Sequence, residues 1–309
     1  MRILVTGGTG MVGKAISRTE SNHDIILVGS TDYDLKKSLD ATKMIIDTRP
    51  DAILHLAARV GGIKGNTDYI ADFFYDNILI NTNVLEAARK LNINKLVSFL
   101  STCVYPDSAP YPLTPDKIHL GAPHKSNFGY AYAKRMLDVH SRAIRQQYGL
   151  KYTTVIPNNL YGKNDNFDLE NSHVIPAIIR KVWEAKQGNS KVTLWGDGSP
   201  LREFTLSDDI AKILINILES DIDFVEPLNI GATGEYSIKQ IAEMICNTMG
   251  YKFRNVEWDI TKPSGQHRKP SCNKKFLSNF PDFKYTDMSS GLSETCTWFM
   301  ENYPNVRGV

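Results

Sequence analysis

Tyr130 and Lys134 lie four residues apart in this chain of 309 residues, a spacing that places both side chains on one face of a helix. A phenol and an ammonium held together could move a proton to or from a carbonyl oxygen. An ammonium about 4 Å from a phenolate stabilises it by ~4 kcal/mol at an effective dielectric constant of about 20. That energy corresponds to roughly three pKa units before burial opposes it. The pair therefore predicts a phenol whose pKa is tuned toward neutrality.

A second set of reactive side chains, Ser101-Thr102-Cys103, ends a predicted strand at residues 95–100. If the chain stays extended there, Ser101 and Cys103 point to the same ligand and Thr102 points away. Ser101 could then hydrogen-bond a carbonyl oxygen alongside Tyr130. Hydride transfer does not need Cys103, so this residue is either a buried packing thiol or the mark of additional chemistry.

Tyr33 and Lys37 repeat the same spacing. A chain with 14 tyrosines is expected to contain such a match by chance, and this one lies in polar sequence without a reactive neighbour. It predicts a surface position.

A glycine-rich segment at residues 7–13 follows a predicted strand and opens a predicted helix at residues 11–18. This arrangement is typical of a dinucleotide-binding turn, in which backbone N–H groups approach a pyrophosphate. A plain strand-to-helix turn and a P-loop are the alternatives, but Ala15 lacks the hydroxyl that a P-loop offers to Mg²⁺. The predicted cofactor-binding residues of this segment are Gly7, Gly8, Thr9, Gly10, Met11, Val12 and Gly13.

The next predicted strand, at residues 25–28, indicates which dinucleotide binds. An acidic residue at its end would hydrogen-bond the adenosine ribose of NAD. Here Ser30 follows, which leaves room for a 2′-phosphate and predicts NADP (NADPH) as the cofactor. Asp32 and Asp34 come slightly later and leave NAD open.

The elements that must position these groups alternate between short apolar runs and helical patterns. They predict an α/β fold, a Rossmann-type doubly wound parallel sheet. Its strands are expected at residues 3–6, 25–28, 52–56, 95–100 and 152–156, and its helices at 11–18, 41–47, 73–91 and 130–148.

Shorter elements after residue 162 predict a smaller α/β C-terminal lobe that binds the substrate. We expect residues 1–162 to form the NADP-binding domain, with 203–232 returning to it, and 163–202 and 233–309 to form the lobe. The expected elements are helices at 174–185, 208–218 and 238–249, strands at 192–195, 227–230 and 253–258, and a loop at 261–273.

Composition limits the partners and the cellular location that we expect. A net charge of +2 argues against a nucleic-acid or membrane partner. The four cysteines form no CxxC pair and no zinc-finger spacing, so we expect free thiols, no metal and a cytoplasmic location.

Several longer stretches carry a resemblance to a known family. They lie at residues 55–62, 100–106, 127–136, 156–162 and 172–177. Together they resemble the extended short-chain dehydrogenase/reductase family, and within it the 3,5-epimerase/4-reductases of GDP-4-keto-6-deoxy-D-mannose. The resemblance implies a homodimer that inverts carbons 3 and 5 of this 4-keto sugar and then reduces carbon 4 with NADPH.

The same resemblance implies roles for particular residues. Inversion next to a ketone removes a proton from one face and returns it on the other, and Cys103 and His173 match the family's acid/base pair. Without the resemblance, His173 reads as a structural histidine. Ser101, Tyr130 and Lys134 match the reductase triad, and Lys134 would also hold the nicotinamide ribose. Tyr130 could stabilise the enolate oxygen as well.

Further positions match the family's ligand contacts. The cofactor contacts are Ala57, Pro157, Asn158, Asn159, Leu160 and His173, and the substrate contacts are Lys181, Trp195, Arg202 and Lys269. Taken without the resemblance, Lys181 and Arg202 read as solvated charges and Trp195 as core. Ser264-Gly265 departs from the Asp-Gly often found in the family, so a sugar contact there is in doubt.

Two other functions fit the same motifs. One is an NAD-dependent nucleotide-sugar 4-epimerase, which would hold its cofactor tightly and consume none. The other is a non-catalytic dinucleotide-sensing protein, although a sensor has no need of a Tyr130–Lys134 pair.

Overall fold

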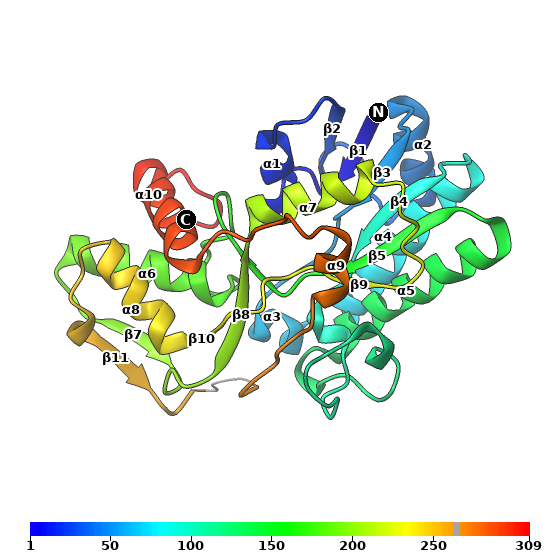
Figure 1. Ribbon diagram of the computed structural model, residues 1–309. Helices are drawn as coiled ribbons and strands as arrows, with labels where there is room; N and C mark the ends of the chain where they lie inside the picture. Colours follow the sequence, from blue (N-terminus) through cyan, green and yellow to red (C-terminus); the bar gives the residue numbers. More distant parts are fainter. Residues whose placement is uncertain (263–265) are drawn as a thin grey trace.

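The computed structural model describes residues 1–262 and 266–309 (Figure 1). Its main sheet has six strands, and every neighbouring pair is parallel. The strand order reverses between the first and third strands, which is where open α/β sheets bind ligands. In order across the sheet the strands are β2 (Asp24–Val28), β1 (Arg2–Thr6), β3 (Ala52–His55), β4 (Lys95–Phe99), β5 (Lys151–Ile156) and β9 (Leu228–Asn229).

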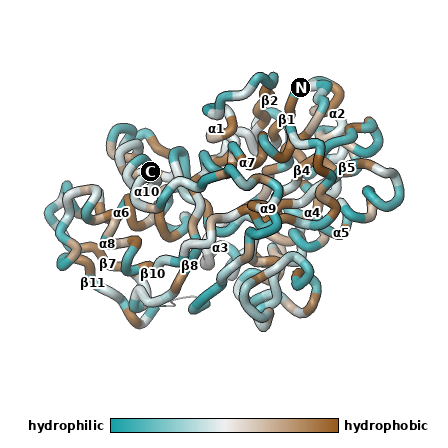
Figure 2. The backbone as a smooth tube through the Cα atoms, in the orientation of Figure 1, coloured by the Kyte–Doolittle hydropathy of each residue, from teal (hydrophilic) through white to brown (hydrophobic). Residues whose placement is uncertain are grey.

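Helices cover both faces of this sheet, because successive strand residues point to opposite sides. Ile3 and Val5 pack with α1 (Met11–Arg18) and α7 (Ser207–Glu219) on one face. Leu4 packs on the other face, which is covered by α2 (Ser38–Thr48), α4 (Ile70–Lys90) and α5 (Phe128–Tyr148). Figure 2 shows hydrophobic sequence around β4 and mostly hydrophilic sequence in the peripheral loops. The predicted Rossmann-type fold is confirmed.

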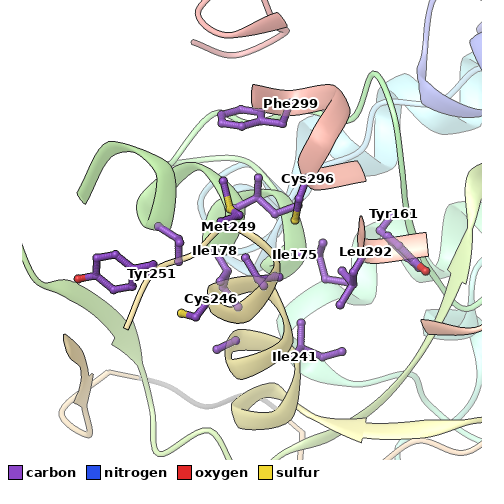
Figure 3. Close-up of a cluster of buried hydrophobic side chains, with 14 of the residues drawn as sticks. Tyr161, Ile175, Ile178, Ile241, Cys246, Met249, Tyr251, Leu292, Cys296 and Phe299 are labelled. Carbon is purple, nitrogen blue, oxygen red and sulfur yellow. The ribbon is translucent and has the colours of Figure 1, made fainter. Parts of the chain in front are cut away.

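A second hydrophobic core lies in the C-terminal part of the chain (Figure 3). It forms between α6 (Val174–Gly188), α8 (Ile238–Thr248) and α10 (Met288–Asn302). Strand β7 (Val192–Trp195) pairs in parallel with β11 (Val256–Asp259). A three-stranded sheet joins this second lobe to the main sheet; its order is β10 (Glu235–Ser237), β8 (Leu201–Leu206), β6 (Asn159–Tyr161). Among the described residues, no helix is long and apolar enough to cross a bilayer.

The structure differs from the sequence-based elements mainly in this second lobe. The predicted strand at 253–258 begins as a 3₁₀ turn, Phe253–Asn255, before β11. Strand β8 pairs with β6 and β10, so the chain rejoins the main sheet only from α7 onward. The predicted division into domains stays a prediction. The elements that the sequence reading missed are β6, β8, β10, α10, α3 (Ile63–Asp68) and α9 (Lys274–Asn279).

Two helices of the second lobe begin at side-chain caps that are visible in the sequence. Ser237 Oγ accepts a hydrogen bond from the Gln240 N–H, and Gln240 Oε1 accepts one from the Ser237 N–H. This reciprocal capping box starts α8. Asp287 accepts a hydrogen bond from the Ser290 N–H at the start of α10, at 3.0 Å. Both caps satisfy backbone donors that a helix start leaves unpaired.

Candidate active site

A cavity of about 800 Å³ opens at the carboxyl ends of the main-sheet strands and extends to the second lobe. Its wall includes the segments at the ends of five strands: Gly7 and residues 9–13 after β1, 28–30 and 33–36 after β2, 56–61 after β3, 99–102 after β4 and 157–160 after β5. Residues 165–173 and Arg307 close the side toward the second lobe. The size and the place suit a dinucleotide.

The glycine-rich turn packs closely against the neighbouring backbone. Gly7 has φ +71°, which favours glycine, and Gly10 caps α1 without a side-chain hydrogen bond. A Cβ atom on Gly13 would lie 2.5 Å from Gly8 Cα, so these two glycines let α1 approach the sheet. The predicted residues Gly7, Thr9 and 10–13 line the cavity. Gly8 does not line it, because its N–H donates to Val28 O at 2.8 Å and faces β2.

The adenosine end of the cavity is lined by Ser30 and by residues 33–36. Asp32 is turned toward the backbone, where its carboxylate accepts a hydrogen bond from the Gly29 N–H at 2.8 Å. Tyr33 also lines the cavity, and its hydroxyl donates to Asp47 at 2.9 Å. The predicted surface position is therefore wrong for Tyr33, whereas Lys37 is exposed. Tyr33 lies in the loop between β2 and α2, and its hydrogen bond to Asp47 of α2 holds it against the cavity, which its polar sequence context does not reveal.

Hydrogen bonds between strands fix the segment expected beside the nicotinamide. Asn158 Nδ2 donates to Ala232 O at 2.6 Å, and the Thr205 hydroxyl donates to Asn158 Oδ1 at 2.7 Å. Asn159 Nδ2 donates to Glu203 O at 2.8 Å. Pro157, Asn158, Asn159, Leu160 and Ala57 line the cavity as predicted.

Tyr130 and Ser101 line the same cavity, and Lys134 lies behind them. The Lys134 ammonium is buried, donates to Phe99 O at 2.8 Å and lies 5.8 Å from the centre of the Tyr130 ring. Burial lowers the pKa of Lys134 to about 8. Burial also raises the pKa of Tyr130 well above its usual value, with the nearby Cys103 adding to the rise.

The expected lowering of the Tyr130 pKa is thus wrong for this structure. Loss of water around the phenolate outweighs the attraction of the ammonium, because desolvation of a fully buried charge costs several pKa units. The result keeps Tyr130 protonated at neutral pH, and a protonated phenol is the form that donates a proton.

The Ser101–Cys103 segment also departs from its expected geometry. Strand β4 ends at Phe99, and Thr102–Val104 form a 3₁₀ turn capped by Ser101. The Cys103 N–H donates to Ser101 Oγ at 3.4 Å. The chain is therefore not extended, and Ser101 and Thr102 line the cavity while Cys103 does not.

The Cys103 thiol is 7% exposed, and burial raises its pKa. The charges of Lys269 and Lys134 and a hydrogen bond with Ser101 oppose that rise. Cys103 is thus close to Tyr130, Lys134 and Lys269, although it lies outside the dinucleotide cavity.

His173 lies on the cavity wall at the N-cap of α6. The residue is exposed to the cavity, and the surrounding protein lowers the pKa of the imidazole below its usual value by desolvation. His55 offers a contrast, because it is buried between Thr6 and Asn81 at 2.8 and 3.1 Å. Burial lowers the His55 pKa to about 3, which identifies a structural histidine.

The predicted GDP contacts lie on the second lobe, and none of them is among the described residues that line the cavity. Lys181 Nζ donates to Thr193 O at 3.0 Å, next to Trp195 in β7. Trp195 is 54% exposed, so its interpretation as a core residue is wrong. Burial and the neighbouring charge of Arg202 lower the pKa of Lys269, which places these two cations close together. The Ser264-Gly265 departure lies outside the described residues.

Several residues that line the cavity were not predicted from the sequence. Arg59 pairs with Asp76 at 2.9 Å after β3. Asp165, Asn166 and Arg307 line the side toward the second lobe. Arg307 is far from the glycine-rich turn in sequence, so no local pattern relates the two.

Comparison with known proteins assigns the class. Residues 3–231 match the NAD dependent epimerase/dehydratase family, and the chain belongs to that family. It is 41% identical to a GDP-L-fucose synthase of Dictyostelium discoideum, covering 99% of this chain and 97% of the relative. It is 37% identical to a GDP-L-colitose synthase of Yersinia pseudotuberculosis, covering 99% of this chain and all of the relative.

A solved structure of a GDP-L-fucose synthetase is also similar to this chain. The crystal structure of a GDP-L-fucose synthetase from Naegleria fowleri bound to NADP has a TM-score of 0.92 and 38% identity, covering 99% of this chain and 94% of that one. These matches confirm the resemblance that the motifs predicted.

Proposed function

We propose that this protein is a GDP-L-fucose synthase. It converts GDP-4-keto-6-deoxy-D-mannose into GDP-L-fucose by inverting carbons 3 and 5 and reducing carbon 4 with NADPH. One observation carries the proposal: Ser101, Tyr130 and His173 line the cavity of the glycine-rich turn, and Cys103 lies next to them. The similarity of the whole chain to GDP-L-fucose synthases supports the choice of substrate.

The cavity fits NADP on its own features. A Cβ atom at Gly7 would lie 2.9 Å from the Ala57 nitrogen, so glycine lets the turn pack directly against the segment that follows β3. Asp165 Oδ2 and Ser172 Oγ are buried without a partner among the described residues, as expected of a wall that faces a polar ligand. When bound, NADPH supplies the hydride. The residues that would hold it are Gly7, Thr9, Ser30, Ala57, residues 10–13 and residues 157–160.

For the reduction, Tyr130 donates its proton to the oxygen on carbon 4, and the Ser101 hydroxyl donates a hydrogen bond to the same oxygen. Lys134 contributes a positive charge behind the phenol, which favours the phenolate left after proton transfer. Its hydrogen bond to Phe99 O holds the end of β4, from which Ser101 projects.

For the epimerisation, one group accepts a proton from the sugar and another returns one to the opposite face. Burial favours the neutral forms of both His173 and Cys103, so the free protein holds an imidazole that can accept and a thiol that can donate. Tyr130 and Ser101 stabilise the enolate oxygen on carbon 4. The sugar lies between the cavity and Cys103, with its diphosphate toward Arg202 and Lys269 and its base toward Trp195 and Lys181.

The direct test is the purified protein with GDP-4-keto-6-deoxy-D-mannose and NADPH in deuterated water. We expect NADPH oxidation, deuterium at carbons 3 and 5, and GDP-L-fucose identified by NMR. A reaction with no NADPH oxidation and no deuterium uptake would contradict the proposal. A product with the stereochemistry of another GDP-sugar, such as that made by a GDP-L-colitose synthase, would correct the substrate.

A variant separates the two half-reactions. Cys103→Ser should impair deuterium uptake strongly and leave the dissociation constant for NADPH unchanged, because Cys103 lies outside the dinucleotide cavity. Unchanged deuterium uptake would make Cys103 a packing residue.

The homodimer and the cytoplasmic location belong to the same proposal and rest on the resemblance. Sedimentation of the purified protein tests the first, and microscopy of the tagged chain tests the second. A 4-epimerase would give no net NADPH oxidation, and a sensor would bind the dinucleotide without turnover.

A further inference from the structure

The last four residues of the chain reach the wall of the dinucleotide cavity. Val306 is buried, and the Phe167 N–H donates to Arg307 O at 2.8 Å. Arg180 Nη1 donates to Gly308 O at 2.6 Å and to Phe167 O at 3.1 Å, so it joins the tail to the neighbouring loop. The backbone on both sides of the Arg307 side chain is therefore held in place.

Gly308 shows how close this contact is. Its φ is +88°, and a Cβ atom there would lie 2.4 Å from the Asp168 nitrogen. Only glycine permits this approach without a shift of the loop. The tail thus packs against residues 166–168, and the exposed Arg307 side chain lines the cavity.

Arg307 differs from the other cations that line this cavity. Arg59 pairs with Asp76 at 2.9 Å, and Lys36 lies 3.8 Å from the same carboxylate. Within residues 1–262 and 266–309, Arg307 forms no ion pair with a carboxylate. An unpaired guanidinium on the wall of a cavity is available to an anionic ligand.

Asp165 lies close enough to Arg307 for the two charges to interact, and it is a weak partner. Its side chain is 6% exposed, one oxygen accepts the Asn166 N–H at 2.7 Å, and the other has no partner among the described residues. Burial raises its pKa to about 7, although the Arg307 charge opposes the rise. A carboxyl with this pKa is only partly ionised near neutral pH, so it balances the Arg307 charge incompletely.

The start of α1 and Arg307 lie on the wall of the same cavity. Arg18, at the end of α1, donates to Asn164 Oδ1 at 2.8 Å, so the loop with Asp165 runs beside this helix. The N-terminus of α1, at Gly10 and Met11, lines the cavity together with Asp165 and Arg307. The pyrophosphate of a dinucleotide binds at such a helix N-terminus.

We propose that Arg307 completes the dinucleotide site by binding the pyrophosphate from the side opposite the glycine-rich turn. The inference deepens the proposed function, since it rests on NADPH as the cofactor. The glycine-rich turn, residues 7–13, contains no cationic side chain of its own. The C-terminal tail supplies that charge from the second lobe.

The test measures binding and needs no GDP-sugar. Dissociation constants for NADPH and NADH are determined by calorimetry for the wild type, Arg307→Ala and Arg307→Lys. A charge-assisted hydrogen bond to phosphate is worth enough that Arg307→Ala should weaken both dinucleotides about 10-fold or more. Arg307→Lys should recover part of the affinity, because it keeps the charge and loses the fork geometry. Arg254→Ala, which removes an exposed arginine of the second lobe, is the matched control.

The remaining outcomes distinguish failure of this inference from failure of the proposed function. Equal constants for Arg307→Ala and the wild type would overturn the inference and leave the proposed function intact. Loss of NADPH affinity alone would place Arg307 at the 2′-phosphate and overturn the pyrophosphate assignment. Full affinity in the double variant Asp165→Asn with Arg307→Ala would show that Arg307 only neutralises Asp165. A wild type that binds neither dinucleotide would overturn the proposed function as well. Equal melting temperatures of the unliganded variants would confirm that each variant folds.

Discussion

The dinucleotide cavity and the second lobe offer their ligands different kinds of contact. The cavity is shaped by backbone and close packing, with Gly13 against Gly8, and two of its three cations are close to Asp76. The second lobe presents side chains, among them the exposed Trp195. Substitutions in the closely packed wall of the dinucleotide cavity should therefore disturb folding as well as binding. Substitutions of exposed side chains in the second lobe should affect affinity alone.

Tyr130 lies where the two regions meet, and its loss should have the largest effect. Tyr130→Phe removes the proton donor while keeping the ring, so kcat for reduction should fall by about 10²–10⁴. The dissociation constant for NADPH and the free energy of unfolding should change little. Stopped-flow NADPH oxidation and calorimetry measure these quantities. Tyr132→Phe, off the cavity wall, is the control, and a Tyr130→Phe enzyme with more than about a tenth of wild-type kcat would refute the role of the phenol.

Gly13→Ala tests whether the first region couples binding to folding. The added methyl group would meet Gly8 Cα at 2.5 Å and push α1 from the sheet. We expect the free energy of unfolding to fall by about 1–3 kcal/mol, and NADPH affinity to fall with it. Urea denaturation gives the first quantity. Gly188→Ala, where the added methyl group would meet Ser190 Oγ at an ordinary 3.8 Å, is the matched control, and equal stabilities of the two variants would break the comparison.

Trp195→Ala tests the opposite property of the second lobe. Because Trp195 is exposed, the free energy of unfolding should stay within about 0.5 kcal/mol of the wild type. Loss of stacking on the base should raise KM for the GDP-sugar about 10-fold, with kcat and NADPH affinity unchanged. Steady-state kinetics measure KM for the GDP-sugar and kcat. The control is Ile260→Ala, which truncates another exposed apolar side chain of this lobe, and a Trp195→Ala enzyme with the same KM as this control would remove Trp195 from the substrate site.

Lys134 gives the smallest effect, a pH dependence of stability. Its pKa in the folded protein is about 8, below the usual 10.5, because burial disfavours the ammonium. Between pH 8 and 10.5 the unfolded chain therefore holds more protons than the folded one. The cost of burying the charge is fully present below pH 8, and the free energy of unfolding should rise with pH above it.

The rise should be on the order of 1 kcal/mol between pH 7.5 and 9. Urea denaturation at several pH values should show it in the unliganded wild type and not in Lys134→Met. Parallel curves for the two proteins would mean that Lys134 keeps its charge throughout this range.

The main sheet was predictable because its signals are local. Each strand is a short apolar run beside a helical pattern, and the first helix was expected at the residues where α1 lies. The elements of the second lobe were harder to predict, since β10 has only three residues, and β8 and β10 are stabilised by pairing with strands distant in sequence. The start of α10 carries a capping signal at Asp287 that the reading did not use.

The candidate active site also combines features that were predictable from local sequence with features that were not. The glycine-rich turn, Ser101, Tyr130 and the 157–160 segment all follow main-sheet strands, so their place on the cavity wall was foreseeable. The position of Cys103 was not, because a 3₁₀ turn replaces the extended chain that strand continuation would give.

The sequence alone determined the fold class and the family, because these depend on periodicity and on motifs that are close in sequence. Only the tertiary structure decided the protonation states. Burial depends on residues from many segments, and it raises the pKa of Tyr130 where the neighbouring ammonium alone would lower it. The fold also brought Arg307 to the glycine-rich turn, because the tail packs on residues 166–168, which no local pattern records.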